Sequence, residues 1–477
     1  MTAQNSRKPG REIAWILLGF GYFLSVSHHE EPSEKRQLTL IDCLGIGING
    51  IVGSGIFLLP AALWRRAGSQ APWAWFVAGG LCCLVALVFA EAAGRTDRSG
   101  GPYRYACDAF GPYVGFAVGW VTLVSVLLGY SAVARGFGST AAQILHDLAG
   151  VQVGNAGVVG LSCLVVVMLA LVNILGVRSS ARTSDVISAV KLLSLFGFIV
   201  VGFLFVKASR LSGIAPMPEK GEATGILAAA FAGLFATTGF EFIPVPAGEA
   251  KNPRRTVPLA MVISVLLTTA IYALVQLVAT GLHPQLGLSE TPLADAVGQF
   301  AGERGKELMN VAGLISMFGF CAGSALVGPR YLESFAEDRF VPQIFAKRPA
   351  RFGTPVWSVV LLSILVMSFL MLGLEFKQLA DISNVAVVVQ YIATCVAVIL
   401  MRKRGPAPKE AFVNPLGPLV PLLALSGCMV FLLGVATSPD GVMALKWAAV
   451  LIAVGLLLGS GFRKMVLTPV GKENEPG

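Results

Sequence analysis

The sequence predicts an all-α polytopic membrane protein with twelve transmembrane helices. Hydrophobic residues make up 55% of the chain and charged residues only 13%, whereas a soluble domain carries about 25% charged residues. The mean hydropathy is +0.73. Apolar stretches of at least about 18 residues are candidates to cross a bilayer. Twelve such stretches can be identified, at residues 41–63, 71–94, 111–142, 155–176, 184–207, 224–248, 256–281, 304–332, 354–374, 379–402, 414–436 and 441–462.

The distribution of positive charge predicts the orientation of these spans. An even number of spans places both termini on one side, and positively charged loops stay in the cytoplasm. Most of the 36 Lys and Arg residues fall in the two termini and in the loops on their side. We therefore expect a multi-pass protein of the plasma (cytoplasmic) membrane with both termini cytoplasmic. The same asymmetry accounts for the net charge of +9, so a nucleic-acid partner is not expected.

The N-terminal segment, residues 1–40, is expected to be cytoplasmic and contains a short apolar stretch from Ile13 to Val26. This stretch is followed by small residues that imitate a signal-peptide cleavage site. Cleavage would place the next residues outside, against the charge bias, and the stretch is too short to span a bilayer. An interfacial segment, a signal-like segment and a start-site artefact remain open interpretations.

The eight cysteines and four histidines form no catalytic or metal-binding pattern. No cysteine pair has the spacing with histidines that a zinc site needs. The cysteines fall in predicted spans or near cytoplasmic ends, where a disulfide framework is not expected. No arrangement of a nucleophile and a base is evident. The sequence thus predicts no metal, no cofactor and no enzymatic activity.

The first predicted span contains a cluster of glycines that includes Gly53-Ser54-Gly55. A glycine inside a helix costs about 1 kcal/mol relative to alanine. Close helix packing explains the glycines between residues 45 and 50, but adjacent glycines around a serine favour a non-helical backbone. An interrupted helix in a membrane is tolerated where it is buried in protein or lines a cavity. The half-helix that starts near Ile56 would then present free N–H groups and its positive dipole end, which favours an anion.

The sixth predicted span repeats this pattern, because Gly239 is followed by Pro244 as Gly55 is followed by Pro60. Transporters built from inverted repeats place discontinuous helices at corresponding positions of their two halves. The first and sixth of twelve spans are the positions that a five-plus-five repeat requires. We therefore expect helices 1 and 6 to be discontinuous.

Five motifs occur along the chain: GSGIFLLP in the first span, GGPYRY after the second, GFE in the sixth, KNPRRTVP after it, and GPRYLESFAEDRFVP after the eighth. Together they resemble the amino acid–polyamine–organocation superfamily of permeases over roughly residues 37 to 465. The resemblance implies a LeuT-like core of two inverted five-helix repeats, 41–207 and 224–402, then peripheral helices in 414–462 and a cytoplasmic tail, 463–477.

The resemblance also implies a substrate site at the two helix breaks. The carboxylate of an amino acid would meet Ser54 and Gly55, with Gly53 beside them, in agreement with the anion site inferred from the glycines. Its ammonium group would meet main-chain carbonyls, as half-helix ends and unwound carbonyls suit a cation. The matching carbonyls belong to Ile51, Phe235, Ala236 and Thr238.

Two residues of the sixth span are expected to act as gates. Phe235 matches the aromatic gate of the family, the alternative being a plain packing or lipid-facing phenylalanine. Glu241 follows the break and belongs either to the substrate and proton path or to a gate contact, with a structural role as the alternative. Thr237 stands where a bulky aromatic residue is common in the family, so the preference for a substrate side chain cannot be transferred.

Ionisable residues inside spans are costly and mark functional sites by default. Lys191 lies about 10 Å into the fifth span at 1.5 Å per residue. Either it snorkels to the surface, or it couples transport to protons, as the resemblance to proton-coupled members with a lysine on this helix implies. We expect Lys191 to be the proton-coupling residue. Arg135 is expected to snorkel, and Glu91 is expected to be solvated or to tether a loop.

The sequence therefore predicts a secondary active transporter of amino acids, with proton-coupled symport by alternating access. Its expected partners are an amino acid substrate, protons and the lipid bilayer, with no obligatory protein partner. The alternative mechanism is an antiporter that exchanges amino acids or amines. A membrane sensor or the carrier-like subunit of a complex is the alternative from a different class.

Overall fold

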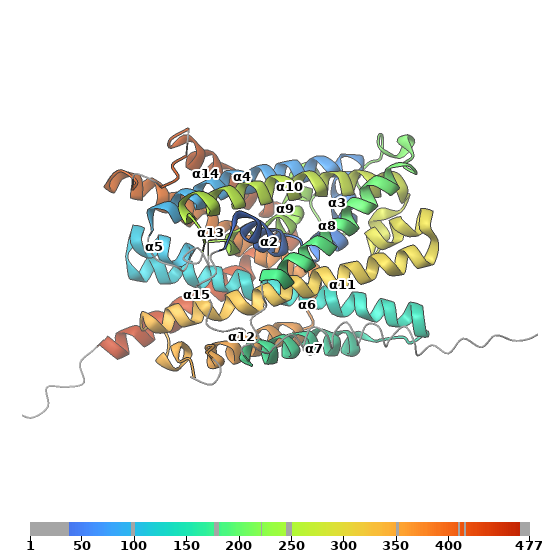
Figure 1. Cartoon of the computed structure of the whole chain (residues 1–477). Helices are drawn as coiled ribbons and strands as arrows, with labels where there is room; N and C mark the ends of the chain where they lie inside the picture. Colours follow the sequence, from blue (N-terminus) through green and yellow to red (C-terminus); the bar gives the residue numbers. More distant parts are fainter. Residues whose placement is uncertain are drawn as a thin grey trace, which may run out of the picture. The chain divides into compact units, whose positions relative to one another are not determined.

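The computed structural model describes residues 38–96, 101–175, 181–220, 222–244, 250–349, 353–408, 411–414 and 416–467. The apolar stretch Ile13 to Val26, the rest of residues 1–37 and residues 468–477 of the predicted tail lie outside the described residues. The described part is helical (Figure 1). Its only β-type pairing is an isolated parallel bridge between Leu38 and Ala250.

The first half of the chain forms one interrupted helix and a series of long helices. These are α2 (Leu40–Ile51), α3 (Gly55–Ala67), η1 (Gly68–Gln70), α4 (Ala71–Arg95), α5 (Pro102–Phe110), α6 (Pro112–Ala149), α7 (Asn155–Ile174), α8 (Ala181–Phe203) and η2 (Ala208–Arg210).

The second half begins with another short helix that is followed by a 3₁₀ turn. Its elements are α9 (Ile226–Thr237), η3 (Phe240–Phe242), α10 (Pro253–Leu282), η5 (Leu286–Leu288), α11 (Pro292–Glu337), η6 (Gln343–Ala346), α12 (Val356–Met371), α13 (Phe376–Arg404), α14 (Leu419–Val435) and α15 (Pro439–Leu467).

Among the described residues, seven helical segments are long and apolar enough to cross a membrane, and five shorter apolar helices have 10 to 17 residues. The shorter group includes α2 and α9, which lie at the two predicted breaks. The chain is thus a helical multi-pass membrane protein, while the count of twelve spans and the repeat stay predictions.

The helix break in the first span lies at the glycines that predict it. Thr39 caps α2, since its hydroxyl accepts from the backbone N–H of Asp42 and the Asp42 carboxylate accepts from the backbone N–H of Thr39, an arrangement that satisfies two free N–H groups. α2 ends at Ile51, Val52 has a non-helical ψ of 89°, and α3 begins at Gly55. Residues 52–54 are buried, which meets the condition for an interrupted helix in a membrane.

The second break lies at the end of α9. Thr238 is extended, and Gly239 has a φ of 112°, which glycine adopts without steric cost. η3 then runs from Phe240 to Phe242. The first helix is therefore interrupted over residues 52–54, where Ser54 already has helical dihedrals as the N-cap of α3, and the second is interrupted at Thr238 and Gly239.

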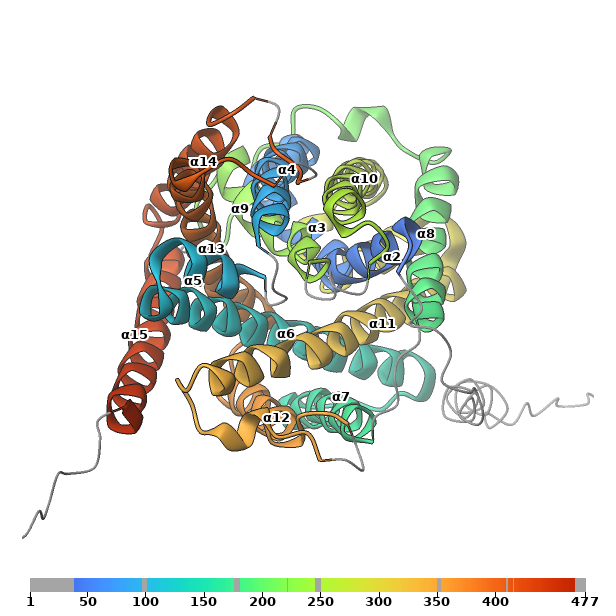
Figure 2. The same cartoon turned by 60° about the vertical axis from the view of Figure 1, so that its left-hand side comes forward.

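The helices around α2 and α3 place both breaks inside the bundle. α2 packs on α8, α10 and α11, and α3 packs on α9 and α11. Figure 2 shows α2 and α3 among these helices, with α7, α12, α14 and α15 farther from them. Many side chains of α7 and α15 are exposed, as expected for helices that face lipid.

Glu91, near the end of α4, connects three segments of the chain. Its carboxylate accepts from Arg402 Nε of α13 at 2.7 Å, from Arg95 Nε at 3.1 Å and from Asn414 Nδ2 at 2.8 Å. The Glu91 side chain has no exposed surface. The expected loop tether is present, but the expected solvated carboxylate is wrong, because a buried carboxylate needs paired cations and hydrogen bonds.

Candidate functional site

The start of α3 presents an unused hydrogen-bonding group at the first break. Ser54 is fully buried, and its hydroxyl has no hydrogen-bond partner among the described residues. The first N–H groups of a helix lack intrahelical partners, and the helix dipole adds a partial positive charge there. Gly53 and Gly55 flank this hydroxyl and are also buried. The start of α3 is therefore suited chemically to a carboxylate.

The end of α9 and the end of α2 present carbonyl groups. The Phe235 carbonyl accepts from Thr238 Oγ1 at 2.9 Å, and the Ile51 carbonyl accepts from the Tyr272 hydroxyl of α10 at 3.2 Å. The Ile51 carbonyl also accepts from the backbone N–H of Gly53 at 3.0 Å. A carbonyl oxygen has two lone pairs, so a further donor can be accepted at Phe235, whereas both lone pairs of the Ile51 oxygen are already used. The last carbonyls of a helix lack intrahelical partners, so the carbonyl of Phe235 and those that end α9, which include that of Ala236, are chemically suited to accept from an ammonium group.

The two breaks contact each other through backbone. A Cβ added at Gly50 would lie 2.7 Å from the Gly239 carbonyl oxygen, and a Cβ added at Gly55 would lie 2.8 Å from the Ala236 Cα. Real Cβ atoms essentially never approach so closely, so glycine is required at both positions for this packing. The structure thus brings together the predicted residues Gly55 and Ala236, from chain positions that are far apart.

Phe235 is buried, with 7% of its surface exposed, so the lipid-facing alternative is wrong. Its ring makes an edge contact with Phe376, the first residue of α13, at a centroid distance of 5.5 Å. Phe235 therefore joins α9 to α13 next to the break.

Glu241 lies in η3, directly after the second break, and is also buried. Its Oε2 accepts from the backbone N–H of Gly239 at 2.8 Å. The carboxylate thus stabilises the non-helical turn, which supports the structural alternative for this residue beside the predicted gate role.

Lys191 of α8 reaches the end of α2. Its Nζ donates to the Val52 carbonyl at 2.6 Å, to Asn49 Oδ1 at 2.6 Å and to the Asn49 carbonyl at 3.3 Å. The side chain has no exposed surface, so the snorkelling alternative is wrong. A cation is favoured at a helix C-terminus, and the ammonium group of Lys191 occupies this position on α2.

Arg135 of α6 is buried as well, with 8% of its surface exposed. Its guanidinium donates to the side-chain carbonyl of Asn155 at the start of α7. The expectation that Arg135 snorkels is therefore wrong, because a side-chain partner inside the protein replaces water.

Three polar residues at the first break were not predicted. Ser316 of α11 donates to the Gly53 carbonyl at 2.8 Å and to the Val52 carbonyl at 3.1 Å. Asn49 donates from Nδ2 to the Gly319 carbonyl of α11 at 3.3 Å, and Tyr272 bonds Ile51 as described above. A polar residue within an apolar span is costly unless it has a partner, so Asn49 beside the glycines was the available signal.

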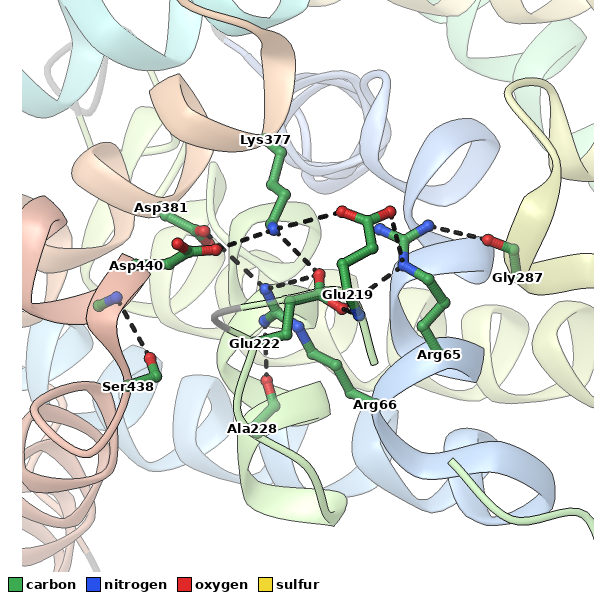
Figure 3. Close-up of polar contacts among 11 residues, drawn as sticks. Arg65, Arg66, Glu219, Glu222, Ala228, Gly287, Lys377, Asp381, Ser438 and Asp440 are labelled. Atoms are coloured by element: carbon green, nitrogen blue, oxygen red, sulfur yellow. Dashed lines mark hydrogen bonds and ion pairs between the residues drawn. The ribbon is translucent and has the colours of Figure 1, made fainter. Parts of the chain in front are cut away.

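A cluster of charged residues, here called the α3–α13 ion cluster, lies between the C-terminal end of α3 and the N-terminal end of α13 (Figure 3). Lys377 Nζ is 3.0 Å from Glu222 Oε1 and 3.1 Å from Asp440 Oδ2. Arg66 Nη2 lies 3.6 Å from Glu222 Oε1 and 3.9 Å from Asp381 Oδ2. The cluster consists of Arg65, Arg66, Glu219, Glu222, Lys377, Asp381 and Asp440.

The cluster binds the 219–222 loop to α3, α13 and the start of α15. Burial alone raises the pKa of Glu222, but the Arg66 guanidinium, the backbone N–H of Glu219 and the Lys377 ammonium outweigh it and lower the pKa to about 2. A carboxylate whose pKa is lowered by folding stabilises the folded state above its ordinary value of 4.5. This stability is lost as the pH falls from about 4.5 towards 2.

We therefore expect Glu222→Gln to lower the melting temperature at pH 7, and to lower it progressively less as the pH falls below 4.5. The neutral amide cannot form ion pairs with Arg66 and Lys377, so the variant lacks the pH-dependent stability that the Glu222 carboxylate contributes. Thermal unfolding of the purified protein in detergent between pH 7 and pH 3 measures the effect. Glu303→Gln, at an exposed position of α11, is the control. An equal difference from wild type at every pH would contradict this role of Glu222.

Comparison with known proteins identifies the family. The family model described as "Amino acid permease" matches residues 38–458. The chain belongs to the amino acid permease family. The match covers both helix breaks, Lys191 and the α3–α13 ion cluster.

Relatives of this permease are transporters. It is 27% identical to the methylthioribose transporter of Bacillus subtilis over 90% of this chain and 94% of the relative. It is 28% identical to the serine/threonine exchanger SteT of the same organism, over 85% of this chain and 92% of the relative. The branched-chain amino acid permease BcaP of Bacillus subtilis is 29% identical, over 84% and 89%. These relatives support a transporter and not an enzyme.

Proposed function

We propose that this permease is a secondary transporter that imports an amino acid together with a proton by alternating access. The observation that carries the proposal is the meeting of two helix breaks beside a buried lysine. One break offers N–H and hydroxyl donors at Ser54, the other offers carbonyls at the end of α9, and the ammonium group of Lys191 holds the end of α2. A zwitterion needs the first two features, and a proton-coupled cycle needs the third.

In this proposal the substrate carboxylate binds at Gly53, Ser54 and Gly55, and its ammonium group binds at the carbonyls of Ile51, Phe235, Ala236 and Thr238. Phe235 closes the site towards Phe376, and Glu241 keeps the second break in its turn. The proposal includes twelve spans arranged as two inverted repeats, 41–207 and 224–402, in the plasma membrane with both termini cytoplasmic.

Lys191 supplies the coupling. When its amine is charged, it donates to the Val52 carbonyl, which also accepts from Ser316 of α11. The charged amine therefore ties α2 to α8 beside the substrate site. Loss of the proton removes the charge that favours this contact and allows α2 to move relative to α8. Binding and movement are thus linked through one titratable group.

An obligate exchanger is the second candidate, because the serine/threonine exchanger SteT is among the relatives. An exchanger moves substrate only when another substrate returns. Counterflow in proteoliposomes with and without internal amino acid distinguishes the two mechanisms. Uptake that requires internal amino acid, and that a proton gradient does not drive, would favour exchange.

A ligand panel tests the proposed substrate class. A ligand that binds only the folded state raises its stability with occupancy, so we expect one group of free amino acids to raise the melting temperature of the purified protein. Their methyl esters should fail, because the start of α3 recognises the carboxylate. Methylthioribose is included because one relative is named as its transporter. Stabilisation by esters or by methylthioribose alone would contradict the proposed site.

A further inference from the structure

The side-chain amide of Asn49 differs chemically from the two main-chain carbonyls that also accept hydrogen bonds from the Lys191 amine. The carbonyls of Val52 and Asn49 can only accept hydrogen bonds, so they suit the charged ammonium. The Asn49 side chain carries both an acceptor, Oδ1, and a donor, Nδ2. At present Oδ1 accepts from Lys191 Nζ at 2.6 Å, and Nδ2 donates to the Gly319 carbonyl at 3.3 Å.

We propose that Asn49 is a positioning residue that pairs with Lys191 in both of its protonation states. The terminal torsion of asparagine is broad and roughly two-fold, so the amide can rotate and present Nδ2 to the lone pair of the neutral amine. Rotation would withdraw the amide donor from Gly319. Deprotonation of Lys191 would therefore loosen the contact of α2 with α11 as well as its contact with α8. This inference rests on the proposed coupling role of Lys191.

The packing around the pair supports a specific arrangement. A Cβ added at Gly319 would lie 2.7 Å from Asn49 Oδ1 and 3.1 Å from Lys191 Nζ. A larger residue at this position of α11 would therefore displace the ends of both side chains. Lys191 and Val52 have no exposed surface, whereas Asn49 keeps some.

The described surroundings contain no carboxylate that could replace the amide. Cys321 of α11 is buried and carries a thiol in place of a carboxylate. Tyr272 of α10 donates to Ile51, and the ionisable residues of α2, Asp42 and Cys43, lie in its first turn. The neutral Asn49 amide is therefore the side-chain group bonded to the Lys191 ammonium among the described residues.

The test compares the pH dependence of proton-driven uptake by proteoliposomes of wild type, Asn49→Asp and Asn49→Ala. An aspartate has the shape of asparagine but would place a negative charge against the ammonium. We therefore expect the pH profile of uptake by Asn49→Asp to shift to higher pH by about one unit or more, the usual effect of an adjacent opposite charge. Asn49→Ala removes an acceptor of the ammonium and should move the profile downward. Exchange at saturating substrate should persist in both variants.

Asn173→Asp is the matched control. Asn173 of α7 also donates from its amide to a carbonyl of α11, that of Ala325, at 2.7 Å, but it has no hydrogen bond to a lysine among the described residues. The pH profile of uptake by Asn173→Asp should equal that of the wild type. Unchanged profiles for both Asn49 variants would overturn the inference, even if Lys191→Ala abolishes proton-driven uptake. Proton-driven uptake that survives in Lys191→Ala would instead contradict the proposed coupling, whatever the Asn49 variants do.

If Asn49→Ala fails to fold, Asn49→Asp decides the question, because it preserves the volume of the side chain. A reduced uptake without a shift of the pH profile would indicate a purely structural role and would also overturn the inference. An upward shift in Asn49→Asp with normal exchange supports it.

Discussion

Gly55→Val is expected to abolish substrate binding and uptake while the protein still inserts into the membrane. A Cβ at this position would lie 2.8 Å from the Ala236 Cα and 3.4 Å from the Ala236 backbone nitrogen. Because this neighbour is backbone, it cannot move away as a flexible side chain can. Overpacking of this kind costs about 1–3 kcal/mol, and each 1.4 kcal/mol changes an affinity about ten-fold. The added side chain would also cover the N–H groups at the start of α3.

Binding is measured by thermal stabilisation with the ligand that the panel identifies, and uptake is measured in proteoliposomes at equal reconstituted amounts. Gly160→Val is the control, because a Cβ at Gly160 of α7 meets nothing within 4 Å. Gly55→Ala should give an intermediate loss. Undiminished binding by a folded Gly55→Val protein would place the carboxylate site elsewhere.

The helix breaks could be predicted because their cause is local. Gly53-Ser54-Gly55 and the glycine at position 239 carry in their own sequence the conformational freedom that a non-helical backbone needs. The structure ends α2 at Ile51 and gives Gly239 a positive φ. The presence of these interruptions therefore follows from residue type alone.

The contacts between distant segments could not be predicted in the same way. Lys191 and Asn49 are 142 residues apart, and the sequence around Lys191 suits a snorkelling side chain equally well. Burial of Arg135 depends on Asn155 at the start of the next helix. Glu222 lies in a short polar loop, and its pairing with Arg66 and Lys377 arises only when three segments of the chain meet. Such partners are set by tertiary packing and not by local pattern.

The residues of the proposed substrate site fall between these two cases. The start of α3 was predictable from the glycines, whereas the carbonyl positions at Phe235 and Ala236 came from the family resemblance. The structure places Ala236 against Gly55, so the start of α3, with its N–H donors, lies beside the end of α9, with its carbonyl acceptors. Substrate binding at these groups stays a proposal that the Gly55 and methyl-ester experiments test.

Lys191→Ala is expected to lose accumulation driven by a proton gradient while it retains exchange. Removal of the amine leaves the Val52 carbonyl with the Ser316 hydroxyl as a donor at 3.1 Å. The hydrogen bonds from Tyr272 to the Ile51 carbonyl and from Asn49 to the Gly319 carbonyl also remain, so the end of α2 keeps its other tertiary contacts. The proposed substrate contacts come from residues 51–55 and 235–238, so binding should survive. Without the titratable group, an inward proton gradient can no longer be converted into a substrate gradient, and internal and external substrate concentrations should end equal.

The measurement is uptake into proteoliposomes with an imposed inward proton gradient and no sodium, at equal amounts of wild type and variant. Counterflow in the same vesicles reports exchange, and Lys446→Ala, at an exposed position of α15, should behave as wild type. Lys191→Arg keeps a cation that is effectively always charged, so it should also exchange without accumulating. Equal concentrative uptake by Lys191→Ala and wild type would rule out the coupling role, because a buried amine that carries the proton cannot be replaced by a methyl group. Strict dependence of the wild type on sodium would remove proton coupling altogether, and Lys191 would then serve as a fixed cation that closes the C-terminal end of α2.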